Sequence, residues 1–72
     1  MKILTQNRDE IIEFPKKVWV TTSGRKGIIV TGRATLNPEI GEYKDINRAK
    51  EVLAEMLQKY AAKESVYIVP EE

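Results

Sequence analysis

The apolar residues of this chain change period part-way along it, and that change predicts the order of its elements. Up to about residue 43 they form short runs or alternate with polar residues, whereas from residue 45 they recur at helical spacing. Two apolar runs, 2–5 and 10–14, flank the polar, turn-prone segment 6–9 and predict a first β-hairpin. Pro15 ends the second run because proline donates no hydrogen bond to a sheet.

A second β-hairpin is predicted between residues 17 and 33. Residues 17–22 alternate and are rich in β-branched and aromatic side chains, which favour strands. Residues 28–33 return as the partner strand. The loop between them, residues 23–27, contains two glycines that can take positive φ.

Side chains of this hairpin alternate between the two faces of the sheet. If Val18 and Val20 face the helix, the inward pair of the partner strand is Ile28 and Val30, or else the register is reversed. The sequence leaves both registers open. In the first, the residues that face away from the helix are Lys17, Trp19, Thr21, Ile29, Thr31 and Arg33.

One amphipathic helix is predicted over about residues 45–61. Asp45 is a suitable N-cap, because its carboxylate can accept hydrogen bonds from the free N–H groups of the first turn. The apolar residues that follow it form one stripe, which we assign as a whole to the hydrophobic core. They are Ile46, Ala49, Val52, Leu53, Met56, Leu57 and Tyr60.

Two shorter strands complete the pattern, one at 40–43 before the helix and one at 66–69 that stops at Pro70. The chain therefore predicts a single α+β domain over residues 1–72. We expect a small antiparallel sheet of four to six short strands with two hairpins, the helix packed on one face, and a C-terminal strand.

The composition excludes most catalytic chemistry. The chain has no cysteine and no histidine, so disulfides, thiolate metal sites and the common nucleophile–base pairs are impossible. Carboxylates alone could hold a hard ion such as Mg²⁺ or Ca²⁺. We expect no enzyme, no metal and no cofactor. Dimerisation is then the remaining route by which so small a domain can bury more surface, which predicts a homodimer.

Targeting signals are also missing from the sequence. The first residues contain no long apolar stretch and no small-residue cleavage site, so they do not resemble a signal peptide. No window approaches the roughly 18 apolar residues that cross a bilayer. We expect a cytoplasmic protein without membrane contact.

Charge is segregated along the chain. Residues 14–38 hold five lysines and arginines and no acid, whereas residues 1–13 and 39–72 carry net charges of −1 and −3. Acid-free stretches of this kind favour an anionic partner or guard an exposed strand edge. Three groups of candidate ligand-binding residues follow: Ser23, Gly24, Arg25 and Lys26 in the loop; Lys17, Trp19 and Arg33 on the strands; and Tyr43 before the helix.

Each group has a functional and a structural interpretation. The loop could grip a phosphate through backbone N–H groups and Arg25, or it is an ordinary charged hairpin turn. Trp19 could stack on a base, belong to the core, or anchor a protein interface. Tyr43 could line an anion site at the helix N-terminus, or it packs under the start of the helix.

Several motifs resemble a group of small uncharacterised proteins of Gram-positive bacteria and their phages or prophages. The segment Ile40-Gly41-Glu42-Tyr43-Lys44-Asp45, followed by Arg48-Ala49 and Glu51-Val52-Leu53, is similar to their LGEYKT…ERA…EVL pattern. Residues 3–8 and 67–72 are similar to their ends. The resemblance implies a mobile-element setting and a compact α+β fold, and it implies no particular activity.

Two functional hypotheses follow. In the first, the chain is a non-enzymatic interaction module that binds a host or phage protein through the basic 16–33 hairpin and the sheet face away from the helix. In the second, the same hairpin binds a nucleotide or single-stranded nucleic acid. A counter-defence protein that sequesters a nucleotide signal or inhibits a host factor is one form of the second.

Overall fold

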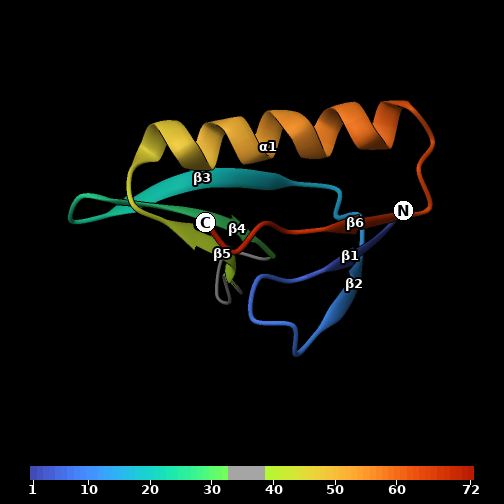
Figure 1. Cartoon of the computed structure of the whole chain (residues 1–72), viewed down its shortest axis with the longest axis horizontal. Helices are drawn as coiled ribbons and strands as arrows, with labels where there is room; N and C mark the ends of the chain where they lie inside the picture. Colours follow the sequence, from blue (N-terminus) through green and yellow to red (C-terminus); the bar gives the residue numbers. More distant parts are fainter. Residues whose placement is uncertain (33–38) are drawn as a thin grey trace.

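The computed structural model describes residues 1–32 and 39–72, and it confirms the α+β class (Figure 1). One helix and six strands follow in the expected order, including the short strand before the helix and the C-terminal strand. Their bounds are β1 Lys2–Leu4, β2 Ile11–Glu13, β3 Val18–Ser23, β4 Lys26–Thr31, β5 Glu39–Tyr43, α1 Ile46–Ala61 and β6 Val66–Ile68.

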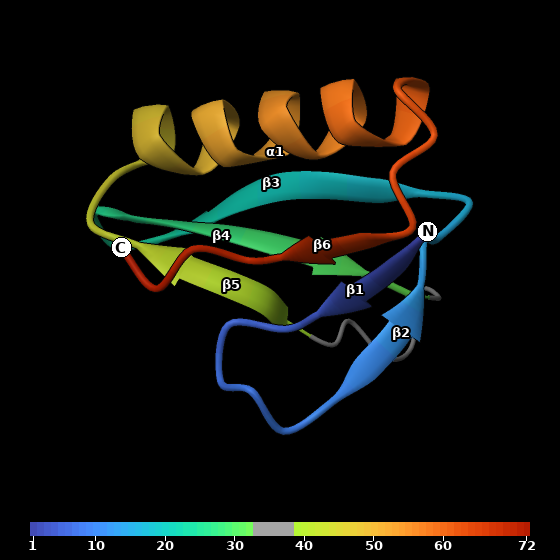
Figure 2. The ribbon, with the colours of Figure 1, turned by 45° about the vertical axis from the view of Figure 1, so that its right-hand side comes forward.

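The strands form two three-stranded sheets. Sheet A has the order β2-β1-β6 and sheet B the order β3-β4-β5. Sheet B is antiparallel throughout. In sheet A, the central strand β1 pairs antiparallel with β2 along one edge and parallel with β6 along the other. Helix α1 lies across sheet B, and sheet A closes the core at the other end of the molecule (Figures 1 and 2). The expectation of one antiparallel sheet missed this parallel pairing, because it joins strands from opposite ends of the chain.

The β3–β4 hairpin is tighter than predicted. Ser23 pairs with Lys26, so the turn contains only two residues, and Gly24 takes a φ of 63°, as glycine does at the first position of a type II′ turn. Gly27 was predicted in the loop but lies within β4. A Cβ there would lie 2.5 Å from the carbonyl oxygen of Asp45, so glycine is needed because the start of the helix passes close over the strand.

The expected face of β3 is confirmed and that of β4 is reversed, because Val18 and Val20 pack against the core together with Ile29. Val20 pairs with Ile29, which is 0% exposed in the core beneath the helix, while Trp19 pairs with Val30 on the opposite face. The period-2 pattern could not decide between the registers, because every residue from Ile28 to Thr31 is buried and β4 is the central strand of its sheet.

Helix α1 begins and ends as capping rules require. The Asp45 carboxylate accepts a hydrogen bond of 2.8 Å from the N–H of Arg48. At the other end Lys63 takes a φ of 62°, and the N–H groups of Lys63 and Glu64 donate to the carbonyls of Tyr60 and Lys59. This is a Schellman motif with lysine in the left-handed position that glycine usually occupies.

The apolar stripe of the helix is only partly core. Ala49, Val52 and Met56 are buried, but Leu57 is 62% and Tyr60 48% exposed, so assigning the whole stripe to the core was wrong. Leu57 and Tyr60 lie at the side of the stripe that faces the segment before β3, where Leu57 lines an open groove and Tyr60 stacks on Phe14. The core itself combines both sheets and the helix: Ile3, Ile29, Ile40, Tyr43, Ala49, Val52, Met56, Tyr67 and Val69.

Gln6 joins the two sheets. Its side-chain oxygen accepts from the N–H of Glu42 at 2.7 Å, and its amide nitrogen donates to the carbonyl of Glu42 at 2.9 Å. The same nitrogen lies 3.2 Å and 3.0 Å from the carbonyls of Pro70 and Glu71. A single amide side chain thus bonds to β5 and the C-terminal segment as a neighbouring strand would.

Candidate functional site

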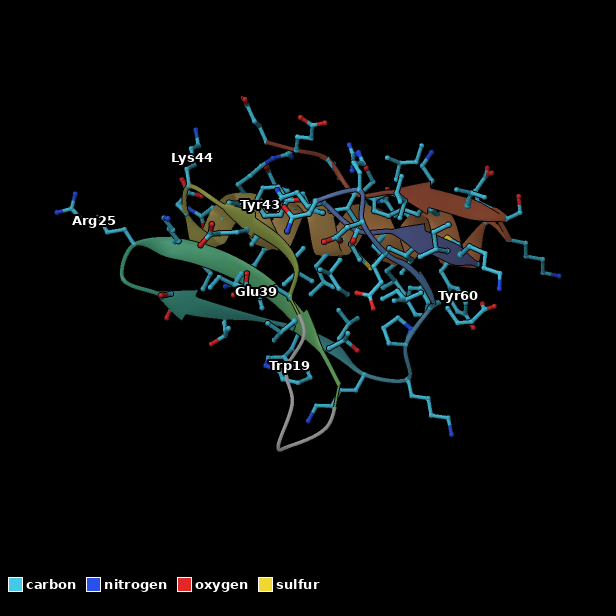
Figure 3. The ribbon with its side chains drawn as sticks, turned by 90° about the horizontal axis from the view of Figure 1, so that it is seen from below. Trp19, Arg25, Glu39, Tyr43, Lys44 and Tyr60 are labelled. Carbon is cyan, nitrogen blue, oxygen red and sulfur yellow. The ribbon has the colours of Figure 1, made fainter. Side chains whose placement is uncertain are left out.

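The predicted binding residues lie in three separate places. Figure 3 shows Arg25 at the tip of the β3–β4 hairpin, Trp19 far from it, and Tyr43 on the opposite side of sheet B. Because these three regions do not converge, no single site contains them. Arg33 lies outside the described residues.

The hairpin tip is exposed and convex. Ser23, Gly24, Arg25 and Lys26 are all exposed, and a Cβ at Gly24 would have no atom within 4 Å. The Lys26 ammonium lies 3.6 Å from the carboxylate of Glu42 across the sheet. The tip thus presents Arg25 to solvent without a concave surface that would surround a phosphate.

Trp19 is half-buried on the face of sheet B away from the helix. The Lys17 ammonium lies 5.2 Å from the centre of its ring, within the range of a cation–π interaction. The lysine therefore already covers part of the surface on which a base would stack.

Tyr43 is 3% exposed and packs under the C-terminal segment. Its hydroxyl donates to the carbonyl of Pro70 at 2.7 Å, and burial raises the pKa of Tyr43 to about 12. The Arg48 guanidinium lies over its ring and donates to the carbonyl of Glu72 at 2.7 Å.

The hollow beside Tyr43 does not suit an anion. Its volume is about 450 Å³, and its lining includes the carboxylates of Glu42, Glu71 and Glu72. These acids would repel a phosphate, and the only cations of the lining are Arg48 and Lys44. Arg48 also lies 3.5 Å from Glu51. The geometry therefore favours the structural interpretation of Tyr43.

A larger concave surface, which the sequence did not reveal, lies between the segment before β3 and one flank of α1. We call it the lysine groove. Its volume is about 630 Å³. Its lining is Phe14, Pro15, Lys16, Lys17 and Val18 from the strand side, and Lys50, Leu53, Ala54, Met56 and Leu57 from the helix.

The lysine groove combines an apolar floor with a basic rim. Leu57 projects into it largely exposed, and the Phe14 ring stacks on that of Tyr60 at 4.0 Å, beside the groove. Three lysines and no acid stand among its lining residues. The Lys17 ammonium lies over the Trp19 ring on the other face of the sheet, so Lys16 and Lys50 supply the charge of the rim. Net positive charge around apolar surface is the complement of a ligand that is both acidic and apolar.

The two flanks of the helix differ in charge. On the flank towards β5 and β6, Glu51 lies beside Arg48, and Glu55 accepts a hydrogen bond of 2.8 Å from the hydroxyl of Tyr67. Burial, and to a lesser extent this hydrogen bond, raise the pKa of Tyr67. The flank towards β3 carries Lys50 and the apolar groove residues. Glu51 and Glu55 thus make contacts within the other flank, and they do not neutralise the positive charge of the groove. In the sequence, the i, i+3, i+4, i+7 spacing of Lys50, Leu53, Ala54 and Leu57 could have indicated this flank of the groove.

A second exposed apolar surface lies on sheet A. Register places Ile11, Leu4 and Ile68 side by side across its three strands, with Val66 two residues along. Ile11 and Ile68 are 68% and 56% exposed. Lys2 and Glu13 lie beside this row and pair with each other across the β1–β2 hairpin, and the Lys2 ammonium lowers the pKa of Glu13. At the β6 side, Glu55, Lys59 and Glu64 border Val66 and Ile68. We call this surface the outer face of sheet A.

Among residues 1–32 and 39–72, no three acidic side chains gather closely enough to hold a metal ion. Within the same residues, no helix has the length and apolar character needed to cross a membrane.

No protein-family model, curated protein or solved structure matches this chain. The resemblance to small phage proteins therefore stays a prediction, and the lysine groove is the feature on which a functional proposal can be built.

Proposed function

We propose that this protein is a non-enzymatic binding module whose lysine groove holds an acidic, partly apolar segment of another protein. One observation carries the proposal: the groove joins apolar floor residues to the exposed lysines Lys16 and Lys50, with no acid in its lining. Burial of apolar surface in the groove is the favourable term, and the costs of association and of ordering the segment offset part of it. Exposed lysines steer an acidic partner towards the groove and exclude basic ones.

The charge of the groove also argues against other occupants. Two copies that met groove to groove would bring Lys16 and Lys50 close to the same lysines of the other copy, which costs free energy. A nucleic-acid base would seek an aromatic platform, but Leu57, the largely exposed floor residue, is aliphatic, Phe14 already stacks on Tyr60, and Trp19 lies on the other face. If the mobile-element setting holds, the partner is a host or phage protein with an acidic surface segment.

Charge reversal tests this proposal with a matched control. The probe is a short capped peptide of alternating leucine and glutamate, and binding is followed by NMR chemical shifts of the ¹⁵N-labelled protein. The triple variant Lys16→Glu/Lys17→Glu/Lys50→Glu should weaken binding at least about tenfold. The control Lys44→Glu/Lys59→Glu/Lys63→Glu changes the net charge equally outside the groove and should leave affinity nearly unchanged.

A further variant removes the apolar floor. Leu57→Gln should also weaken binding, and because Leu57 is largely exposed, the substitution should leave the fold intact. Equal weakening by the two charge triples, or shifts that map away from the groove, would contradict the proposal. Circular dichroism of each variant checks that the helix is retained.

We also propose that the outer face of sheet A binds a second copy of the chain. A twofold interface brings the same patch of both copies together. The centre of this patch is apolar, and Lys2 and Glu13 beside it neutralise each other. Light scattering over a dilution series should show a weak monomer–dimer equilibrium, which Ile68→Lys shifts to monomer. A strict monomer at millimolar concentration would refute the proposal.

The alternative of nucleotide or nucleic-acid binding rests on the exposed Arg25 and on the Lys17–Trp19 contact. Titration of Trp19 fluorescence with single-stranded oligonucleotides and cyclic nucleotides distinguishes it. A response that falls steeply with salt would support this alternative. A flat response at low salt, together with peptide binding in the groove, would favour the interaction module.

A further inference from the structure

Strand β3 forms one edge of sheet B and, within the described residues, pairs only with β4. The register shows which of its backbone groups stay open. Ser23 and Lys26 close a two-residue turn, which makes them a hydrogen-bonded pair. Since such pairs alternate along an antiparallel ladder, Thr21 and Trp19 also direct their N–H and C=O groups towards β4.

The intervening residues, Val18, Val20 and Thr22, therefore direct their N–H and C=O groups away from β4, towards the open edge. An edge of this kind is a template for another strand. The segment that leads into it carries Lys16 and Lys17, so an approaching strand meets positive charge at this end.

This edge and the lysine groove adjoin each other. Val18 belongs to both, as a residue of β3 and as a lining residue of the groove. The groove lies between the β3 side of the molecule and the helix flank of Lys50, Leu53 and Leu57. A strand laid along β3 would therefore direct every second side chain under this flank, because side chains alternate between the faces of a sheet.

We infer that the partner segment binds as an added strand: an extended, acidic stretch of another protein pairs with β3 and extends sheet B to four strands. Its backbone bonds to the open groups of Val18, Val20 and Thr22. Alternate apolar side chains enter the lysine groove, and neighbouring acids meet Lys16 and Lys50. In this mode the main chain supplies affinity and the groove supplies specificity. The inference rests on the proposed function and adds to it the conformation of the ligand.

Backbone methylation of the probe peptide tests the inference separately from the proposed function. Two versions of the leucine–glutamate peptide are compared, one N-methylated at the leucines and the other at the glutamates. Alternate residues of an added strand direct their N–H groups to β3, so one version should bind at least about tenfold more weakly than the other. Hydrogen exchange of the complex gives the second readout. The amides of Val18, Val20 and Thr22 should gain protection on binding, whereas those of Trp19 and Thr21 should be protected already.

The outcomes distinguish strand addition from the proposed function. Groove binding that both methylated peptides retain equally, without new protection on β3, would overturn strand addition and leave the proposed function standing. Failure of the unmethylated peptide to bind would overturn both. Unequal binding together with alternating protection establishes strand addition. A peptide of alternating leucine and lysine, which should not bind, controls for non-specific β-association.

Discussion

Gly27 offers the sharpest test of the packing of helix on sheet. The substitution Gly27→Ala places a Cβ on β4 under the start of α1. That atom would lie 2.5 Å from the carbonyl oxygen of Asp45, 2.7 Å from the Cα of Ile46 and 2.8 Å from the Cβ of Ala49. Two of these three neighbours are backbone atoms, so no side-chain rotation can relieve the contact.

The expected cost follows from these distances. Ordinary contacts of a Cβ begin near 3.4 Å, so the first turn of the helix must move by close to 1 Å, away from the Asp45 cap and the buried Ala49. Overpacking of this kind costs about 1–3 kcal/mol, and more where backbone must shift. We expect about 3 kcal/mol from a total stability of about 5–10 kcal/mol. The melting temperature should fall by roughly 10–20 °C.

Urea unfolding followed by circular dichroism at 222 nm measures the change in the free energy of unfolding. Gly24→Ala is the matched control in the same hairpin, because a Cβ there meets nothing within 4 Å and only its positive φ is strained. It should cost about 1–2 kcal/mol. The double variant Gly27→Ala/Ala49→Gly should recover little, since both backbone contacts remain. A Gly27→Ala variant no less stable than Gly24→Ala would refute the close approach of helix and strand.

Three further predictions concern stability. Gln6→Ala should lower the free energy of unfolding by about 1–3 kcal/mol in urea titrations, because it removes the bonds to the backbone of Glu42 and the C-terminal segment; an unchanged midpoint would contradict the bridging role. Lys63→Gly should raise the melting temperature, since glycine takes the left-handed conformation at φ 62° without strain; a decrease would contradict the C-cap assignment. Burial raises the pKa of both Tyr43 and Tyr67 above 10, so the unfolded chain loses these protons first. The contribution of the two tyrosines to the free energy of unfolding should therefore be fully present below pH 10 and should decrease as the pH rises from 10 towards 12. In urea titrations at each pH, Tyr43→Phe should make this decrease smaller.

Local signals predicted the fold wherever short-range chemistry decides it. Asp45 capped the helix as its position suggested, and the alternation of residues 18–22 marked β3 correctly. The parallel pairing of β6 with β1 was out of reach, because no periodicity records which distant strands meet. Gly27 was placed in the loop for a related reason. The sequence does not distinguish a glycine that is needed because a helix packs closely on the strand from a glycine that is needed in a turn.

The candidate site was harder to predict. The charge asymmetry drew attention to the segment that contains Lys16 and Lys17, but the described part of the acid-free stretch, residues 14–32, does not form one surface. Its apex carries Arg25 away from the rest, while Lys50, from a segment of mixed charge, joins the groove. Leu57 was assigned to the core because hydrophobic spacing alone cannot distinguish a buried stripe from one that overhangs the edge of its sheet.

The parallel pairing of β1 with β6 also sets the order in which the molecule can fold during synthesis. Sheet B and the helix take all their strands and turns from residues between 18 and 61, whereas sheet A takes β1 and β2 from the start of the chain and β6 from its end. The β1–β2 hairpin, by contrast, waits for β6, because a lone hairpin of three-residue strands is at best marginally stable in water. During that interval the β1 edge is unpaired, with Leu4 and Ile11 uncovered beside it. A chain that lacks β6 would therefore expose this edge and would be prone to aggregate or to be captured by a chaperone.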